Sequence, residues 1–87
     1  MTNEKINEVI GMYIKTNIFK EKNSVLDCSK NLFIDYGFDS ITIIELLIYL
    51  EEKFSIQFDL INLDLAELNS INSISNNVNK MLVERKL

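Results

Sequence analysis

The segment from residue 40 to residue 54 constrains the fold most, because its apolar residues recur at helical spacing on two sides of one helix. At about 100° per residue, one side collects the residues that we expect to face the core. They are Ile43, Leu46, Leu47, Leu50 and Phe54. The other side carries Ile41, Ile44 and Ile48, with Glu45 and Glu52 close by and Glu51 at the edge. Since a helix in a small domain normally buries one stripe, this second side is either another core contact or a docking surface rimmed by carboxylates.

A glycine turn leads directly into this helix. Gly37 is followed by Asp39 and Ser40, and Ser40 begins the apolar pattern. Glycine permits a tight turn, and aspartate and serine are preferred at helix caps. The first turn of a helix has unpaired N–H groups at the positive end of the helix dipole, so it favours an anion. The sequence therefore predicts an exposed hydroxyl at Ser40, in a place that tolerates a phosphate.

Further helices are predicted on either side of this segment. Apolar residues recur at helical spacing from about residue 3 to residue 17, where Thr2 or Asn3 can cap the helix. Residues 20–39 show no sustained period and are expected to form a long loop. A short helical turn is predicted around residues 64–68, and a final helix begins near Asn69 or Ser70. We therefore expect an all-α fold, a four-helix bundle with three longer helices and one short helix, forming a single domain over residues 1–87.

Charge and composition disfavour several classes of function. The net charge is −4, from 13 acidic and 9 basic residues, which argues against nucleic-acid binding and suits basic partner surfaces. No apolar run approaches the roughly 20 residues of a membrane span, and the first residues lack the pattern of a signal peptide. The one cysteine, Cys28, cannot form an internal disulfide and is expected to be an unreactive packed thiol. We expect a cytoplasmic protein.

Catalytic chemistry is also disfavoured. The chain has no histidine, which removes the usual base for a serine or cysteine nucleophile and the commonest metal ligand. The carboxylates of Asp35, Asp39, Glu45 and Asp59 do not have the spacing of a calcium-binding loop, and there is no glycine-rich phosphate loop. The sequence therefore predicts a protein that is not an enzyme and binds no metal.

The region around Ser40 resembles the modification site of acyl carrier proteins and of the related peptidyl carrier domains. The matching residues are Leu32-Phe33, Asp35, Gly37 and Asp39-Ser40-Ile41. Two further features fit the family, namely Glu45, five residues after the serine, and Glu51-Glu52-Lys53-Phe54 near the helix end. The later Leu68-Asn69-Ser70-Ile71 resembles the family's entry into its last helix. The resemblance covers nearly the whole chain.

The resemblance implies a carrier function. In that family a transferase attaches 4′-phosphopantetheine from coenzyme A to the motif serine, here Ser40, and the arm then holds acyl or aminoacyl groups as thioesters. Gly37 and Asp39 would shape the attachment site. Partner enzymes would meet the surface of Ile41, Ile44, Glu45, Ile48 and Glu52. The implied partners of this monomeric carrier are a phosphopantetheinyl transferase, an adenylating or acyl-loading enzyme, and a downstream synthase, transferase or thioesterase.

Departures from the family pattern bear on the pathway. Many fatty-acid carriers have Asp-Ser-Leu and a more acidic second helix, whereas here Ile41 follows the serine and Glu45 is the only acid before Glu51. This favours a freestanding carrier in specialised biosynthesis, of the nonribosomal peptide or polyketide type. A fatty-acid or D-alanyl-type carrier is one alternative. The other is a small helical adaptor that binds a partner through Ile41, Ile44 and Ile48 and has no prosthetic group, so that Asp39 and Ser40 are only a helix cap.

Overall fold

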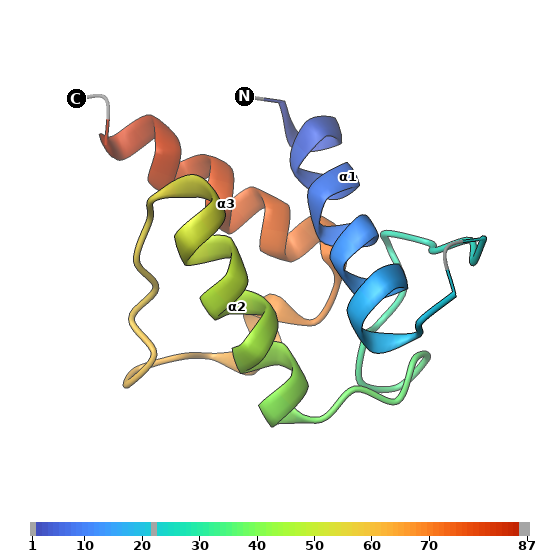
Figure 1. Cartoon of the computed structure of the whole chain (residues 1–87). Helices are drawn as coiled ribbons and strands as arrows, with labels where there is room; N and C mark the ends of the chain where they lie inside the picture. The colour runs from blue at the N-terminus through green and yellow to red at the C-terminus, as the bar shows by residue number, and fades with distance from the viewer. Residues whose placement is uncertain (1, 22, 86–87) are drawn as a thin grey trace.

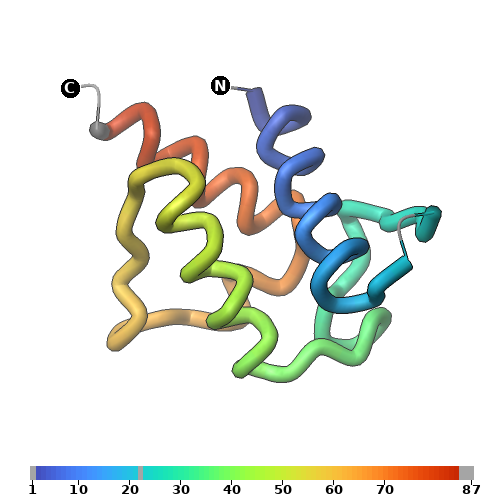
Figure 2. The backbone as a smooth tube through the Cα atoms, in the orientation of Figure 1, coloured from blue at the N-terminus to red at the C-terminus, as the bar shows by residue number. Residues whose placement is uncertain are grey.

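The computed structural model describes residues 2–21 and 23–85, with side chains as far as Glu84. Within these residues the fold is all-α, with three α-helices and no strand. The helices are α1 (Asn3–Tyr13), α2 (Ser40–Phe54) and α3 (Ile71–Arg85). A π-helical turn, η1 (Ile14–Ile18), extends α1, and a 3₁₀ turn, η2 (Leu65–Leu68), precedes α3. Figures 1 and 2 show that the start of α1 and the end of α3 lie at one end of the molecule and the start of α2 at the other.

The helix predicted over residues 40–54 coincides with α2, and the all-α prediction is confirmed. The predicted short helix corresponds to the 3₁₀ turn η2. Asp64 caps this turn, because its Oδ1 accepts a hydrogen bond of 3.0 Å from the Ala66 N–H. A 3₁₀ turn closes over fewer residues than an α-helix, so it fits the brief connection into α3.

The first helix begins where a threonine cap was expected. Thr2 Oγ1 accepts a hydrogen bond of 3.3 Å from the Lys5 N–H. At the other end the helix widens into η1, where the Phe19 N–H donates to the Ile14 carbonyl at 2.9 Å. Two side chains of this turn, Thr16 and Asn17, donate to backbone carbonyls one turn earlier. The helical segment therefore extends to Ile18, one residue beyond the predicted end.

Helices α1 and α3 pack against each other. Beside the apolar contacts runs a row of neutral polar side chains, which we call the amide ladder: Asn3, Asn7, Asn72, Ser75, Asn76 and Asn79. Asn7 Nδ2 donates to Asn72 Oδ1 at 3.0 Å, and Asn79 Nδ2 donates to Asn3 Oδ1 at 2.8 Å. The Ser75 hydroxyl, which is fully buried, donates to Asn7 Oδ1. These bonds satisfy polar groups at the helix contact and fix how the two helices align.

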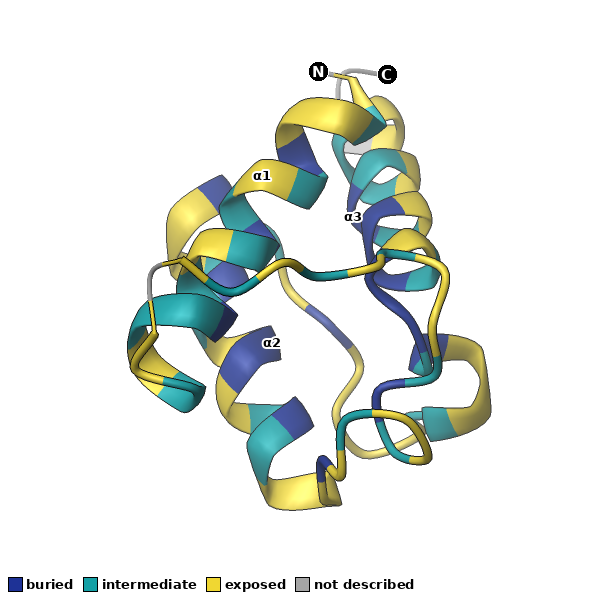
Figure 3. Ribbon diagram, turned by 90° about the vertical axis from the view of Figure 1, so that its right-hand side faces the viewer, coloured by how far each residue is buried: buried dark blue, intermediate teal, exposed yellow. Residues whose placement is uncertain are grey.

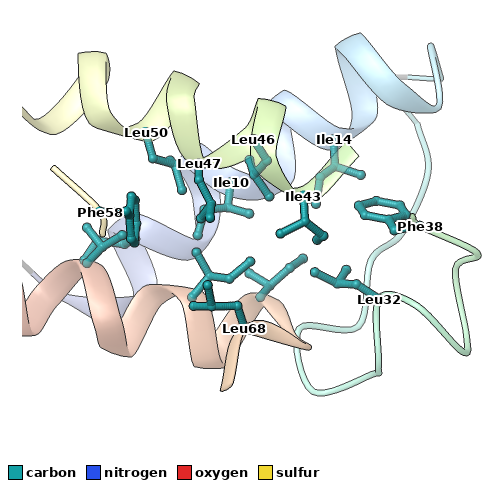
Figure 4. Packing of buried hydrophobic residues seen from close by; sticks show 14 of the residues in the cluster. Ile10, Ile14, Leu32, Phe38, Ile43, Leu46, Leu47, Leu50, Phe58 and Leu68 are labelled. Atoms are coloured by element: carbon teal, nitrogen blue, oxygen red, sulfur yellow. The ribbon is translucent and has the colours of Figure 1, made fainter. Parts of the chain in front are cut away.

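One apolar core joins the three helices. Every α2 residue that was predicted to face the core is buried. Figure 3 marks the buried positions on the ribbon, and Figure 4 shows side chains from the helices and loops meeting in the core. Helices α1 and η1 contribute Ile6, Ile10 and Ile14, and α3 contributes Ile71, Ile74 and Val78. Four more buried residues come from outside the α-helices: Leu32, Phe38, Phe58 and Leu68.

The long loop before α2 is fastened to the start of α3. The Leu32 N–H donates to the Asn69 carbonyl at 2.7 Å, and the Asn72 N–H donates to the Cys28 carbonyl at 3.0 Å. Leu32 also inserts its side chain fully into the core. The loop that carries the residues before Ser40 is therefore held by backbone bonds as well as by apolar packing.

We expect the two sides of α2 to differ in their contribution to stability. Leu46 is fully buried, so Leu46→Ala should lower the free energy of unfolding by about 2–5 kcal/mol. Ile41 is 66% exposed, so Ile41→Ala should change it by no more than about 0.5 kcal/mol. Urea unfolding followed by circular dichroism measures both values. Equal losses in the two variants would contradict the assignment of the two faces.

Candidate functional site

Asp39, one of the two residues that the sequence offered as a cap, is the N-cap of α2. Its Oδ1 accepts a hydrogen bond of 2.8 Å from the Thr42 N–H, and its carbonyl accepts one of 3.2 Å from the Ile43 N–H. The hydrogen bond from the Thr42 N–H is the main reason why the pKa of the Asp39 carboxyl lies below its ordinary value. The cap therefore carries a negative charge at neutral pH, next to the positive end of the helix.

The turn before this cap depends on Gly37. Its φ angle is +71°, a left-handed conformation that side chains with a Cβ disfavour. A Cβ placed on Gly37 would meet no atom within 4 Å, so the requirement for glycine comes from the backbone angle and not from crowding. The Gly37 N–H also donates to the Phe33 carbonyl at 3.1 Å. The predicted tight turn is confirmed.

The residues immediately before Gly37 form a second hydrogen-bonded turn. Asn31 Oδ1 accepts hydrogen bonds of 2.9 Å from the N–H groups of Phe33 and Ile34. Asp35 Oδ2 returns to accept from the Asn31 N–H at 2.9 Å. The motif residue Asp35 therefore acts within its own loop. This turn presents Ile34 to solvent with 82% of its surface exposed, which the sequence pattern did not reveal.

Ser40 is the first residue of α2, and its side chain is exposed. Its hydroxyl has no hydrogen-bond partner among the described residues. The described residues also contain no group of three acidic or sulfur side chains that could hold a metal ion. The chain also contains no histidine to remove the hydroxyl proton. The arrangement leaves the Ser40 hydroxyl exposed, without the histidine that most often activates a serine.

The second side of α2 remains largely uncovered. Ile41 and Ile48 are 66% and 44% exposed, Glu45 and Glu52 are exposed, and Ile44 is half-buried. These five residues are called the docking surface below. An exposed apolar strip with a carboxylate rim is typical of a contact site for another protein. The structure therefore brings the predicted partner-binding residues together on one helix face, beginning next to Ser40.

A pair of tyrosines borders this surface. The rings of Tyr13 and Tyr49 stack with centroids 4.5 Å apart and planes 28° from parallel. Burial, and then the charge of Glu45, raise the pKa of Tyr13 above its ordinary value. The charge of Glu45, on α2, therefore acts on the Tyr13 hydroxyl of α1.

Glu51 has a different role from its neighbour Glu52. Its Oε2 accepts a hydrogen bond of 2.8 Å from the Phe58 N–H, which ties the connection between α2 and η2 back onto α2. Helical spacing placed Glu51 at the edge of the docking surface, but no sequence signal pointed to a backbone partner seven residues away. This carboxylate holds the fold, whereas Glu52 is exposed.

Cys28 lies half-buried in the loop beneath α1. The pKa of the Cys28 thiol is raised above its ordinary value, mainly by burial and secondly by the charge of Asp27. A thiol with a raised pKa is less ionised at neutral pH and therefore less reactive.

Together these features place an exposed hydroxyl at a helix start beside an exposed apolar surface, the arrangement that the resemblance to carrier domains implies. The family model for the phosphopantetheine attachment site matches residues 16–78, which include all of α2 and η2. The chain belongs to this family. Its members carry 4′-phosphopantetheine covalently on a serine, are not catalysts themselves, and interact with a phosphopantetheinyl transferase and acyl-handling enzymes. No match to a curated protein was found. None of the helices in the described residues has both the length and the apolar character to cross a bilayer.

The lowered pKa of Asp39 predicts a pH-dependent contribution to stability. A carboxyl whose pKa is lowered by folding stabilises the fold above its ordinary pKa of about 4, and loses this effect as the pH falls through the lowered value. The asparagine introduced by Asp39→Asn keeps an acceptor oxygen but lacks the charge. The melting temperature of the natural chain should therefore exceed that of Asp39→Asn at pH 7, and the two should converge in acid.

Melting curves between neutral and acidic pH measure this difference. Glu8→Gln is the control, because Glu8 is an exposed carboxylate away from a helix cap. A gap for Asp39→Asn that stays constant throughout would contradict the charged cap.

Proposed function

We propose that Ser40 is the residue that receives 4′-phosphopantetheine and that the chain acts as one carrier domain. The observation that carries the proposal is the exposed Ser40 side chain on the first residue of α2. A phosphodiester at this position lies at the positive end of the helix, where an anion is favoured. The single apolar core supports treating the chain as one domain.

The other serines in the matched region fit less well. Ser70 and Ser75 are buried, and Ser73 pairs with Ser70. Ser29 donates to Asp27 Oδ1 at 2.6 Å, so its hydroxyl is already engaged. Ser55 follows the negative end of α2, where a phosphate is disfavoured. Ser24 is half-buried in the loop before α2, away from a helix start. This comparison favours Ser40.

The residues around Ser40 have separate roles in this proposal. When attached, the arm supplies a terminal thiol that carries an acyl or aminoacyl cargo. Gly37 bends the chain so that Ser40 is presented, and Asp39 fixes the first turn of α2. Since the chain offers no base for the serine proton, that base belongs to the transferase.

The docking surface would meet the transferase and the enzymes that load or use the cargo. Its isoleucines supply apolar area, and Glu45 and Glu52 favour lysine or arginine on the partner. We further propose a role in specialised biosynthesis, of the nonribosomal peptide or polyketide type. The support is the Asp39-Ser40-Ile41 sequence and the lack of an acid in the first turn of α2. In this proposal η2 takes the place of the short fourth helix.

Intact mass tests the attachment site. The purified chain and Ser40→Ala are incubated with coenzyme A, magnesium and a promiscuous phosphopantetheinyl transferase. We expect the natural chain to gain the mass of one phosphopantetheine and Ser40→Ala to gain none, while circular dichroism shows both to be helical. Ser29→Ala is the matched control and should be modified like the natural chain, since Ser29 is an exposed serine within the matched region.

If Ser40→Ala also gains the mass of phosphopantetheine, the attachment site is a residue other than Ser40. If a control carrier is modified while the natural chain is folded and unmodified, the carrier proposal fails. The adaptor alternative then predicts that partner binding survives Ser40→Ala and is lost in Ile44→Asp.

Reversing one charge tests the docking surface. Glu52→Lys should raise the KM of the transferase for the carrier about threefold, because it replaces attraction to a basic partner with repulsion. Glu8→Lys, on α1, makes the same change in net charge and should leave the KM unaltered. The difference should shrink at about 0.5 M salt, where surface charges are screened. Equal effects from both variants would mean that only net charge matters.

A further inference from the structure

Three aromatic rings connect the end of the first helix to the turn before Ser40. The Phe19 ring lies 5.9 Å from the Tyr36 ring and 6.0 Å from the Phe38 ring, measured between centroids. The contact with Phe38 is edge-to-face, with planes 80° apart, a favourable geometry for aromatic pairs. Phe38 is buried and lies two residues before Ser40. The three rings, called the aromatic clamp below, therefore act on the backbone that leads into the site.

The π-helical turn η1 places Phe19 in this clamp. The Phe19 N–H donates to the carbonyl of Ile14, five residues earlier, so the turn contains one residue more than an α-helical turn. The extra residue changes the direction of every side chain that follows. Thr16 Oγ1 donates to the Met12 carbonyl at 2.7 Å and so helps to hold the end of this helical segment. Isolated π-turns are frequent at functional sites, and this one ends in the residue that contacts the loop.

Tyr36 extends the clamp to an earlier part of the loop. Its hydroxyl oxygen accepts a hydrogen bond of 2.9 Å from the Asp27 N–H. On the other side of Gly37, the Phe38 N–H donates to the Leu32 carbonyl at 3.0 Å. The glycine turn is therefore fixed on both sides, by Tyr36 before it and Phe38 after it, and Phe19 contacts both rings.

We propose that Phe19 is a positioning residue for the modification of Ser40. Its ring holds Tyr36 and Phe38, and this keeps the Gly37 turn in the conformation that presents Ser40 to the transferase. The inference rests on the proposed attachment at Ser40 and adds a residue that lies 21 positions away in the sequence. Without the ring, the loop samples more conformations and a smaller fraction of chains presents Ser40 correctly.

This predicts a particular kinetic signature. When only a fraction of the carrier is competent to bind, the apparent affinity falls by that fraction, while the bound complex reacts as before. Phe19→Ala should therefore raise the KM of the transferase for the carrier by about fivefold and leave kcat unchanged. Phe19→Tyr keeps a ring at this position and should have the same KM as the natural chain. Phe19→Leu, which keeps apolar volume without a ring, should behave like Phe19→Ala.

Ile18→Ala is the matched control. Ile18 lies in the same turn, is half-buried against the same core and has no ring to contact Phe38. Initial rates of mass gain are measured over a range of carrier concentrations, at a temperature where circular dichroism shows every variant to be helical. If Phe19→Ala is not helical, Phe19→Leu takes its place. Ile18→Ala should melt at a lower temperature and keep the KM of the natural chain.

Hydrogen–deuterium exchange supplies a readout that needs no transferase. Peptides covering residues 31–39 should exchange faster in Phe19→Ala than in Ile18→Ala, and peptides of α3 should exchange alike in the two. A natural KM in Phe19→Ala, or the same rise in Ile18→Ala, would overturn the positioning role alone. If the natural chain is never loaded, the attachment proposal fails, and the positioning role fails with it.

Discussion

The burial of one stripe of α2 is the constraint on which the rest of the structure depends. Leu46, Leu47 and Leu50 fill the space between α2 and the other helices, so this helix can pack in only one rotation about its axis. That rotation leaves Ile41 and Ile48 facing outward. The same packing therefore determines both which α2 residues form the core and which form the uncovered surface. A substitution that rotated α2 about its axis would alter both. A second apolar side on a small domain is costly in solubility, which is a reason to connect it with partner binding.

The serine is positioned by a succession of local devices and not by one strong contact. The Asn31 turn, the left-handed Gly37 and the Asp39 cap follow one another within nine residues, and each satisfies backbone groups that would otherwise be unpaired. The aromatic clamp then joins this segment to α1. The Ser40 side chain is exposed and has no hydrogen-bond partner among the described residues, so it does not itself hold this segment in place.

The sequence predicted α2 well because its signals agree with each other. The helical period, the Asp39 cap and the glycine before it all mark the same start, and the buried and exposed sides follow from the period. The same period grouped Ile41, Ile44 and Ile48 with Glu45 and Glu52 on the other side, but it left open whether another part of the chain covers that side. The family match over residues 16–78 then supports the carrier interpretation that the motif around Ser40 suggested.

Other features could not be read from the sequence, because they depend on contacts between distant residues or on backbone geometry. The π-turn η1 has the same apolar residues as an α-helical turn would have, so the pattern cannot separate the two. The role of Glu51 depends on the path of the chain after α2, which brings the Phe58 N–H back to its carboxylate. The abundance of asparagine gave no structural signal until α1 and α3 were seen side by side.

The amide ladder has a consequence for how this protein responds to its surroundings. Its hydrogen bonds join neutral amides and a hydroxyl, so neither ionic strength nor physiological changes in pH alter the charges at that contact. The proposed docking surface, by contrast, carries the exposed carboxylates Glu45 and Glu52, whose interactions with other charges are weakened by salt. The alignment of α1 and α3 and the strength of any contact made through Glu45 and Glu52 thus respond to different variables, so salt can weaken such a contact while the two helices keep their alignment.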